Sequence, residues 1–534
     1  MAIDTTLKTI NGATVLIETL KNLGIDTIFG YPGGIVLDVY DELSKQQDIT
    51  HYLVRHEQSA IHAAEGYARA CGKCGVVLVT SGPGATNIVT GLANAYLDGF
   101  PVIAITGQVS QELLHQDAFQ EVDIVDITKS CTKKNYQVKS INDLQKTLIE
   151  AFEVANSGKK GPVLIDITKN VFSEKFEFKN FETEKNIKST CPSLEIALDI
   201  INHAKSPIII AGGGCIDASK ELFNFVEKSN IPVVSTMIGL GNFPMTNDKY
   251  IGMIGIFGQN SANNAVKESD LVIAIGTRFN DRIRNCLNGN QKIIRIDINE
   301  EEFSKVINST VEIVGDAKII LENLSKKVKK LDIQDWLNYL NILKSQNKLH
   351  EKKSDKIQSF ELISEINKVI KNINPIITTE VGQHQVWASR YLKFNEPRKF
   401  ITSGGLGTMG FGFPSAIGAC IAKNEPVICI AGDGSIQMNI QEIATCMDYN
   451  LPVKVFVLNN GYLGMVRQLQ EKNCEKRYYA TKISNPDFVK LAQSYGAKAF
   501  RVEKVEDIKL TIEQALTIEG FVLVDFVIEP LEVL

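Results

Sequence analysis

The stretch ICIAGDGSIQMNIQEIAT (residues 428–445) decides the fold of this chain. It opens as a continuous apolar run, stops at Gly432, and continues into a segment with the apolar spacing of a helix. Apolar runs that stop at glycine are typical of strands buried on both faces, as in parallel sheets covered by helices. The stretch therefore predicts a strand, a tight turn and a helix, in that order.

Runs of the same kind recur along the whole chain, and helical patterns separate them. The pattern predicts an α/β protein with mainly parallel sheets flanked by helices. The predicted strands are 76–80, 102–106, 163–168, 207–212, 231–235, 271–276, 293–298, 375–379, 427–432, 453–459 and 522–528.

Two charged stretches interrupt this alternation. Residues 170–193 and 326–356 lack clear periodicity, and we interpret both as linkers because a charge run is usually a solvated segment. They divide the 534 residues into three domains, 1–185, 190–330 and 361–534. Between the second and third domains we place the linker at 331–360, which overlaps the second charged stretch. Each domain is long enough to bury a core of its own.

Composition excludes several classes of function. The net charge is −5 and neither half is markedly basic, so a nucleic-acid partner is not expected. No apolar run approaches the roughly 18–20 residues of a membrane span, and the first residues resemble no targeting peptide, which predicts a cytoplasmic enzyme. The ten cysteines, scattered through a long chain, predict reduced thiols. Cys71 and Cys74 form a lone CxxC, which we interpret as two ordinary thiols in preference to a zinc site or a redox pair.

Polar residues follow two of the predicted strands in the last third of the chain. Asp433 comes directly after one strand, and Asn460 ends the run VFVLNN (residues 455–460). A carboxylate and an amide at neighbouring strand ends suit Mg²⁺, which takes oxygen ligands and shares substrate phosphates. Gly432 and Gly434 let backbone amides approach a diphosphate. Two tight turns with a capping aspartate are the alternative, but the pair at this spacing favours the cation and the diphosphate.

This GDG…NN pattern resembles the cofactor signature of thiamine-diphosphate enzymes. The whole chain is similar to the catalytic subunit of the acetohydroxyacid synthase (acetolactate synthase) family, which has three α/β domains. The matching segments are FGYPGG, RHEQ, AAEGYAR, TSGPGATN, AITGQV, DAFQE, GPVLID, VGQHQ, GLGTMGFG, GDGSIQMN and LGMVRQ. The resemblance implies a transferase that decarboxylates pyruvate on thiamine diphosphate. The two-carbon unit then joins pyruvate or 2-oxobutyrate, in branched-chain amino acid biosynthesis. The alternative is another thiamine-diphosphate enzyme, such as pyruvate oxidase or a 2-oxo acid decarboxylase.

The resemblance also implies individual site residues. Glu57 matches the catalytic glutamate that hydrogen-bonds the pyrimidine of the cofactor, and Mg²⁺ is matched by Asp433, Asn460 and the carbonyl of Tyr462. Substrate contacts are matched by Gly34, Phe119, Gln120 and Lys169, for which plain surface residues are the alternative. The remaining thiamine-diphosphate contacts that it implies are Val381, Gly382, Gln383, His384, Gly407, Met409, Gly432, Gly434, Ser435, Gly464 and Met465.

The middle third has its own glycine-rich strand end. A glycine turn, an arginine and an acid at a strand end suit pyrophosphate and ribose, although a degenerate nucleotide fold that holds nothing is the alternative. By resemblance these residues match an FAD site. The matching residues are Gly212, Gly213, Gly214, Thr236, Gly255, Arg278, Asp297, Ile298 and Asp316.

Three further expectations come from the resemblance. A homodimer, often doubled to a homotetramer, brings Glu57 of one subunit to the cofactor of the other, and a separate small regulatory subunit binds the end product. Leu469 stands where the family usually has tryptophan, which puts the choice between pyruvate and 2-oxobutyrate in doubt. Such enzymes are cytoplasmic, or lie in the plastid stroma when encoded in an organelle.

Overall fold

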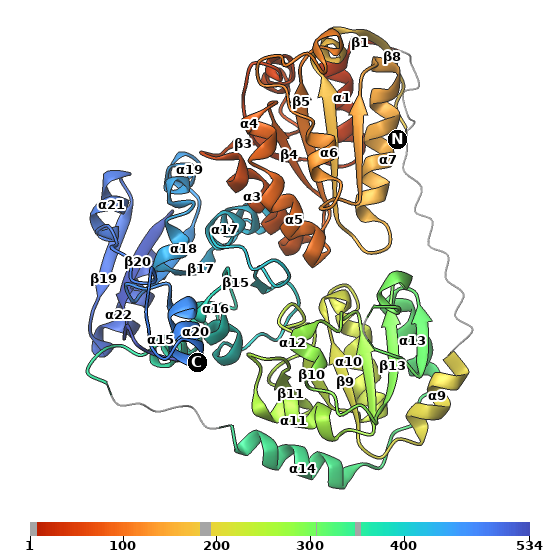
Figure 1. Cartoon of the computed structure of the whole chain (residues 1–534), viewed down its shortest axis with the longest axis vertical. Helices are drawn as coiled ribbons and strands as arrows, with labels where there is room; N and C mark the ends of the chain where they lie inside the picture. The colour runs from red at the N-terminus through yellow and green to blue at the C-terminus, as the bar shows by residue number, and fades with distance from the viewer. Residues whose placement is uncertain (1–7, 182–193, 306, 348–353) are drawn as a thin grey trace.

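The computed structural model describes residues 8–181, 194–305, 307–347 and 354–534. They form three units, each built on one six-stranded sheet (Figure 1). We refer to residues 8–181 as the N-terminal unit, 194–347 as the middle unit and 354–534 as the C-terminal unit. Neighbouring strands pair in parallel in all three sheets, as the apolar runs predict.

The sheet of the N-terminal unit is covered by helices on both faces. A separate antiparallel pair, β1 (Lys8–Asn11) and β8 (Lys175–Phe178), joins the two ends of the unit. In spatial order the strands are β3 (Thr50–Leu53), β2 (Thr27–Tyr31), β4 (Gly75–Val79), β5 (Val102–Gln108), β7 (Pro162–Thr168) and β6 (Lys134–Val138). The helices are α1 (Gly12–Asn22), α2 (Leu37–Ser44), α3 (Glu57–Cys71), α4 (Pro83–Thr86), α5 (Val89–Asp98), α6 (Ile124–Thr128), α7 (Ile141–Asn156) and α8 (Lys169–Ser173).

The middle unit repeats this layered architecture with its own core. Its strands are, in spatial order, β11 (Tyr250–Met253), β10 (Val233–Ser235), β9 (Pro207–Ala211), β12 (Leu271–Ile275), β13 (Lys292–Asp297) and β14 (Val311–Val314). Its helices are α9 (Leu194–Asn202), α10 (Ser219–Ser229), α11 (Asn260–Glu268), α12 (Asp281–Arg284), α13 (Ala317–Lys327) and α14 (Gln334–Ser345).

The C-terminal unit contains the stretch ICIAGDGSIQMNIQEIAT (residues 428–445). Its strands are, in spatial order, β16 (Phe400–Ile401), β15 (Ile376–Thr378), β17 (Val427–Gly432), β18 (Val453–Asn459), β20 (Val522–Val527) and β19 (Lys498–Val502). Its helices are α15 (Ser359–Ile370), α16 (Gln383–Tyr391), α17 (Gly412–Lys423), α18 (Asp433–Ile436), α19 (Ile443–Asp448), α20 (Gly464–Asn473), α21 (Phe488–Ser494) and α22 (Val505–Thr517). The predicted strand, turn and helix are therefore β17 followed directly by the short α18.

Both predicted linkers contain regular structure. The first includes most of α8 and all of β8, and its residues 182–193 lie outside the described part. The second, including the span 331–360, contains α14, and its residues 348–353 also lie outside. Trp336, Leu340 and Leu343 of α14 are buried, and the Trp336 indole N–H donates to the Pro207 carbonyl at 3.0 Å. Three apolar side chains at helical spacing are enough to pack this helix, although charged residues surround them.

Helices α3 and α17 hold the N-terminal and C-terminal units together (Figure 1). Glycines allow their backbones to touch: a Cβ built on Gly66 would lie 2.2 Å from the Ser415 carbonyl oxygen, and one on Gly418 would lie 1.8 Å from that of Ala63. Within the described residues, no helix is both long and apolar enough to cross a membrane.

Candidate functional sites

The C-terminal unit contains a cavity of about 180 Å³ at the carboxyl ends of β17 and β18. All of its lining residues lie between 381 and 528. The sequence-predicted residues that line it are Val381, Gly382, Gln383, His384, Met409, Gly432, Asp433, Gly434, Ser435, Asn460, Tyr462, Gly464 and Met465. Gly407 does not line the cavity but lies against it, since a Cβ on Gly407 would be 3.4 Å from Cγ2 of Val381. Trp387 and Ile528, which lie outside the matching segments, also line it, and so does Leu463, the first residue of LGMVRQ.

Asp433 and Asn460 meet in this cavity because their strands are neighbours in the sheet. The Asp433 carboxylate accepts hydrogen bonds from the backbone N–H of Gly461 at 2.7 Å and from the side chain of Asn485 at 2.7 Å. Burial raises the pKa of Asp433, and these hydrogen bonds oppose the rise. The Asn460 side-chain oxygen accepts from the backbone N–H of Tyr462 at 2.9 Å. A carboxylate and an amide oxygen side by side are the ligand types that Mg²⁺ prefers.

Glycine turns make the cavity suited to a phosphate-bearing ligand, and an unfilled side-chain acceptor beside them suits a hydrogen-bond donor or a cation. The side-chain oxygen of Gln383 is buried without a hydrogen-bond partner. At Gly464 a Cβ would lie 2.1 Å from that same oxygen, so only glycine leaves this wall open. The backbone of Gly432 passes close to the ring of His384, where a Cβ would be 3.0 Å from Nδ1. These features fit a bound diphosphate with its cation.

The middle unit opens into a larger cavity, of about 290 Å³, that is shared by all three units. This volume is close to the lower end of the range for small-molecule sites, about 300–1,000 Å³. Gly213 and Gly214 follow β9 and line this cavity; a Cβ on Gly214 would lie 2.7 Å from Cα of Gly276, and one on Gly213 would lie 2.8 Å from Cγ2 of Ile238. The other sequence-predicted residues that line it are Thr236, Gly255, Arg278, Asp297, Ile298 and Asp316; Gly212 does not line it, since a Cβ there would meet the Gly276 carbonyl oxygen at 2.2 Å.

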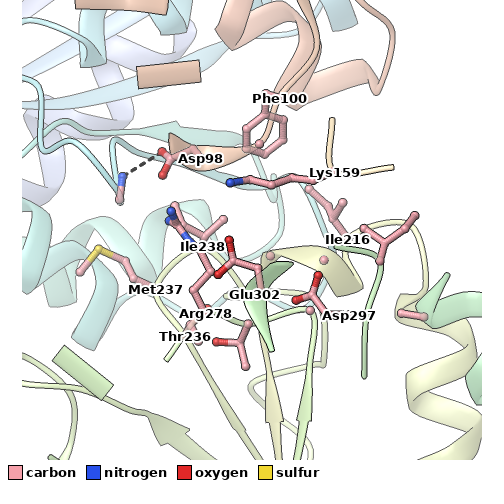
Figure 2. A pocket seen from close by; sticks show the side chains of 18 of the residues that line it. Asp98, Phe100, Lys159, Ile216, Thr236, Met237, Ile238, Arg278, Asp297 and Glu302 are labelled. Atoms are coloured by element: carbon pink, nitrogen blue, oxygen red, sulfur yellow. Dashed lines mark hydrogen bonds between the residues drawn. The ribbon is translucent and has the colours of Figure 1, made fainter. Parts of the chain in front are cut away.

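Figure 2 shows what the sequence did not reveal about this cavity: one wall comes from the N-terminal unit. Asp98, Phe100 and Lys159 lie across from Asp297 and Arg278 of the middle unit. Burial and the nearby Arg278 charge lower the pKa of Lys159. Cations beside glycine turns, with an acid at the end of β13, fit a dinucleotide. Lys159 follows a glycine just before a strand, but nothing local indicates that it reaches into another unit.

Glu57 and the predicted substrate residues lie at the carboxyl edge of the N-terminal sheet. Glu57 is the first residue of α3, and its carboxylate accepts a hydrogen bond from the Asn87 side chain at 2.9 Å. Gln120 lies against Gly82, where a Cβ would be 2.9 Å from the Gln120 Cβ. Gly34, Phe119, Gln120 and Lys169 are all exposed, Phe119 by 88%. None of these residues, nor Glu57, lines either cavity within this chain.

A buried carboxyl group supports the segment that carries Gln120. Asp166 of β7 is fully buried and accepts hydrogen bonds from the Thr106 hydroxyl at 2.7 Å and from the Gln108 side chain at 3.2 Å. Gln108 in turn donates to the Val122 carbonyl at 2.8 Å, just beyond Gln120. Burial raises the pKa of Asp166 to about 6 from its ordinary 3.8, although these hydrogen bonds lower it in part.

The Asp166 carboxyl should make stability depend on pH. Because its pKa is higher in the folded state, the folded protein binds more protons between pH 4 and 6, so this contribution is lost as pH rises through that window. The shift corresponds to about 3 kcal/mol. Asparagine does not titrate, so the difference in melting temperature, Asp166→Asn minus wild type, should become more positive as pH rises from 4.5 to 7. A difference in melting temperature that does not change with pH would contradict this.

Comparison with known proteins supports the assignment of the three-unit fold. Residues 10–127 match the family model described as thiamine pyrophosphate enzyme, N-terminal TPP binding domain; residues 194–324 match its central domain, and residues 380–526 its C-terminal TPP binding domain. The cavity of about 180 Å³ lies within the C-terminal match, apart from Ile528.

Full-length relatives narrow the family further. The chain is 44% identical to the acetolactate synthase large subunit of Buchnera aphidicola, over 94% of this chain and 91% of the relative. It is 40% identical to the isozyme 3 large subunit of Escherichia coli, over 96% and 93% of the two chains. For the chloroplastic acetolactate synthase of Arabidopsis thaliana the identity is 39%, over 97% and 81%. The chain therefore belongs to the acetolactate synthase large-subunit family of thiamine pyrophosphate enzymes.

Proposed function

We propose that the chain is the catalytic subunit of an acetolactate synthase. It removes CO₂ from pyruvate and joins the remaining two-carbon unit to a second 2-oxo acid. With pyruvate the product is 2-acetolactate, and with 2-oxobutyrate it is 2-aceto-2-hydroxybutyrate. The observation that carries the proposal is the C-terminal cavity, where Asp433, Asn460 and the glycine turns of β17 and α20 converge. The full-length relatives of that name support it.

Thiamine diphosphate occupies the C-terminal cavity in this proposal, with Mg²⁺ beside its diphosphate. When bound, it supplies a nucleophilic carbon for the 2-oxo acid and takes up the electrons released with CO₂. Asp433, Asn460 and the Tyr462 carbonyl hold the cation, because they offer three oxygens at one strand edge. His384 and the backbone amides near Gly434 and Ser435 bind phosphate oxygens. Met409, which lines the same cavity, would pack against the rings of the cofactor.

Glu57 holds a proton at the cofactor pyrimidine in this proposal. Its carboxylate is fixed by Asn87 at the edge of the N-terminal sheet, and Gln120 and Lys169 lie at the same edge to meet the carboxylate of a 2-oxo acid. Because these residues line neither cavity of their own chain, a second copy supplies the matching cavity. Exposed apolar side chains at both edges, including Phe119 and Leu469, are suited to burial against that copy.

FAD is proposed for the cavity shared by the three units. Gly213 and Gly214 would let the backbone approach its pyrophosphate, Arg278 and Lys159 would offset its charge, and Asp297 would accept a hydrogen bond from a ribose hydroxyl. The flavin takes no net part in the ligation. A separate small regulatory subunit is a further proposal, since the relatives are named large subunits.

Product analysis tests the proposal. The purified protein would be supplied with thiamine diphosphate, Mg²⁺, FAD and a mixture of pyruvate and 2-oxobutyrate, and its flavin content would be measured on the same sample. We expect acetolactate and acetohydroxybutyrate as the main products. Acetaldehyde or peroxide with little of either would instead indicate a decarboxylase or an oxidase. The product ratio also reports the effect of Leu469, which is 48% exposed beside the C-terminal cavity on α20.

A further inference from the structure

A loop of the C-terminal unit runs between the two cavities. Gly404, near its start, lines the cavity shared by the three units, and Met409, near its end, lines the C-terminal cavity. Residues 402–410 thus touch both proposed cofactor sites, and we call them the bridging loop. Its glycines lie close to the middle unit: a Cβ on Gly404 would be 2.5 Å from Cδ1 of Ile238, and one on Gly405 would be 3.3 Å from the Arg278 guanidinium.

Four side chains from α3 and α5 hold the start of the bridging loop. Asp98 accepts the backbone N–H groups of Gly404 at 3.0 Å and Gly405 at 2.6 Å. The Arg69 guanidinium pairs with Asp98 and with Glu65, and it also donates to the Thr402 carbonyl at 2.9 Å. The fourth member is Asn94, and we call Glu65, Arg69, Asn94 and Asp98 the anchor cluster.

The Asn94 side chain joins the two ends of the bridging loop, near Ser403 and near Thr408. Its side-chain oxygen accepts from the Thr408 hydroxyl at 2.9 Å and from the Ser403 hydroxyl, and the Ser403 oxygen accepts the Thr408 N–H at 2.8 Å. Its amide N–H₂ donates to both Glu65 oxygens, at 3.0 and 2.8 Å. Residues 403 and 408 are therefore pinned to the same side chain.

The anchor cluster is buried, and its one guanidinium faces two carboxylates. Glu65 and Asp98 have no exposed side-chain surface, and Arg69 has 3%. The Arg69 guanidinium also lies over the rings of Phe100, 4.1 Å from the centroid, and Phe411, 5.2 Å from it. Phe100 lines the shared cavity and Phe411 follows the bridging loop. Removing one member of such a cluster leaves the others buried without partners, so the cluster permits one loop conformation.

We propose that the anchor cluster positions the bridging loop for cofactor binding and couples the two cavities. Asp98, Gly404 and Arg278 line the shared cavity, so a ligand there contacts the start of the bridging loop. The end of the same loop carries Gly407 and Met409 to the C-terminal cavity. FAD and thiamine diphosphate each favour the same loop conformation, so each strengthens binding of the other. This inference rests on the proposed function for the identity of the two ligands. The positioning of the loop rests only on the contacts above.

The Asp98→Asn variant tests the coupling. Trp387 lines the C-terminal cavity and is one of two tryptophans, so its fluorescence reports thiamine diphosphate binding in the presence of Mg²⁺. We expect Asp98→Asn to raise the Kd of thiamine diphosphate roughly 10- to 100-fold, as for the loss of hydrogen bonds to a charged group. Saturating FAD should lower the wild-type Kd by about fivefold or more, and this factor should fall to near one in the variant.

A control variant and two loop variants separate positioning from general damage. Asp26→Asn removes a carboxylate that accepts from Tyr67 of α3 at 2.8 Å, far from the bridging loop, and should leave the coupling factor unchanged. Ser403→Ala and Thr408→Val remove the hydroxyl groups with which the bridging loop contacts Asn94. These two variants test the positioning of the loop even if Asp98→Asn does not fold. Amide hydrogen exchange of residues 403–410 in the ligand-free protein should accelerate in the Asp98, Ser403 and Thr408 variants but not in Asp26→Asn.

Two outcomes would overturn the inference. Folded Asp98→Asn and loop variants that keep the wild-type Kd and coupling factor would refute the coupling. Unchanged hydrogen exchange in the loop would refute the positioning. If the wild type bound neither FAD nor thiamine diphosphate, the proposed function would fall instead, and the exchange rates of the ligand-free protein would still decide the role of the anchor cluster.

Discussion

Replacing Glu57 with glutamine should abolish most acetolactate formation, lowering kcat by about 100- to 10,000-fold, the usual contribution of a positioned acid–base group. Glutamine has nearly the same shape and can still accept the hydrogen bond from Asn87, so the fold should persist. It cannot hold or release a proton at the cofactor. The measurement is the steady-state rate with pyruvate, together with the melting temperature and the Kd of thiamine diphosphate, which should change little.

Mixing two inactive variants would show which chains form the site. In a dimer of Glu57→Gln and Asp433→Ala chains, one site has both lesions and the other has neither, if each site combines the two chains. Since half of randomly mixed dimers are of this kind, about a quarter of the wild-type activity should return. A site formed within one chain would give no recovery, and near-normal turnover of Glu57→Gln alone would refute its assigned role.

Replacing Gly418 with alanine should destabilise the contact between the N-terminal and C-terminal units. The new Cβ would lie 1.8 Å from the Ala63 carbonyl oxygen and 2.8 Å from the Tyr67 backbone nitrogen, so helices α3 and α17 must move apart. Overpacking against a rigid backbone costs at least about 3 kcal/mol, which corresponds to a fall of roughly 6–12 °C in melting temperature for a domain of this size.

A second glycine provides the matched control. A Cβ on Gly161 would first meet Cγ of Lys133 at 3.0 Å and no backbone atom, so a shift of this one side chain by a few tenths of an ångström relieves the contact. Gly161→Ala should therefore change the melting temperature by no more than a small fraction of the Gly418→Ala effect. Equal melting temperatures for the two variants would show that α3 and α17 separate at little cost. Because α3 begins at Glu57, Gly418→Ala should also reduce activity below the temperature at which it unfolds.

The sequence predicted eleven of the twelve interior strands of the three six-stranded sheets; it missed the interior strand β2, with the sequence TIFGY, and all the edge strands. All eleven predicted runs correspond to strands, because a strand covered by helices on both faces is continuously apolar. β6, with the sequence KNYQV, and β19, with KAFRV, are edge strands that are partly exposed, so their patterns resemble loops. α14 was missed for a related reason: its buried face is only three side chains wide within a lysine-rich segment.

The sequence could predict which residues gather at the C-terminal cavity, because turns that directly follow two neighbouring strands form much of its lining. The glycines around Asp433 and the amide of Asn460 follow their strands directly, so short motifs mark them. The shared cavity was predictable only on the side of the middle unit. Lys159 and Asp98 come from loops and helix ends of the N-terminal unit, and no local pattern records which distant surface a side chain will meet.

The sequence by itself therefore determined the α/β class, most of the interior strands and the glycine turns that line the C-terminal cavity, since apolar period and turn residues act within a few positions. Only the tertiary structure decided the contacts between units. Asp98 and Gly404 are separated by 306 positions and meet because two close-packed helices bring their units together. Such contacts depend on the shapes of whole packed surfaces, which are sums over many residues, and that is why the anchor cluster and the bridging loop emerged only from the folded chain.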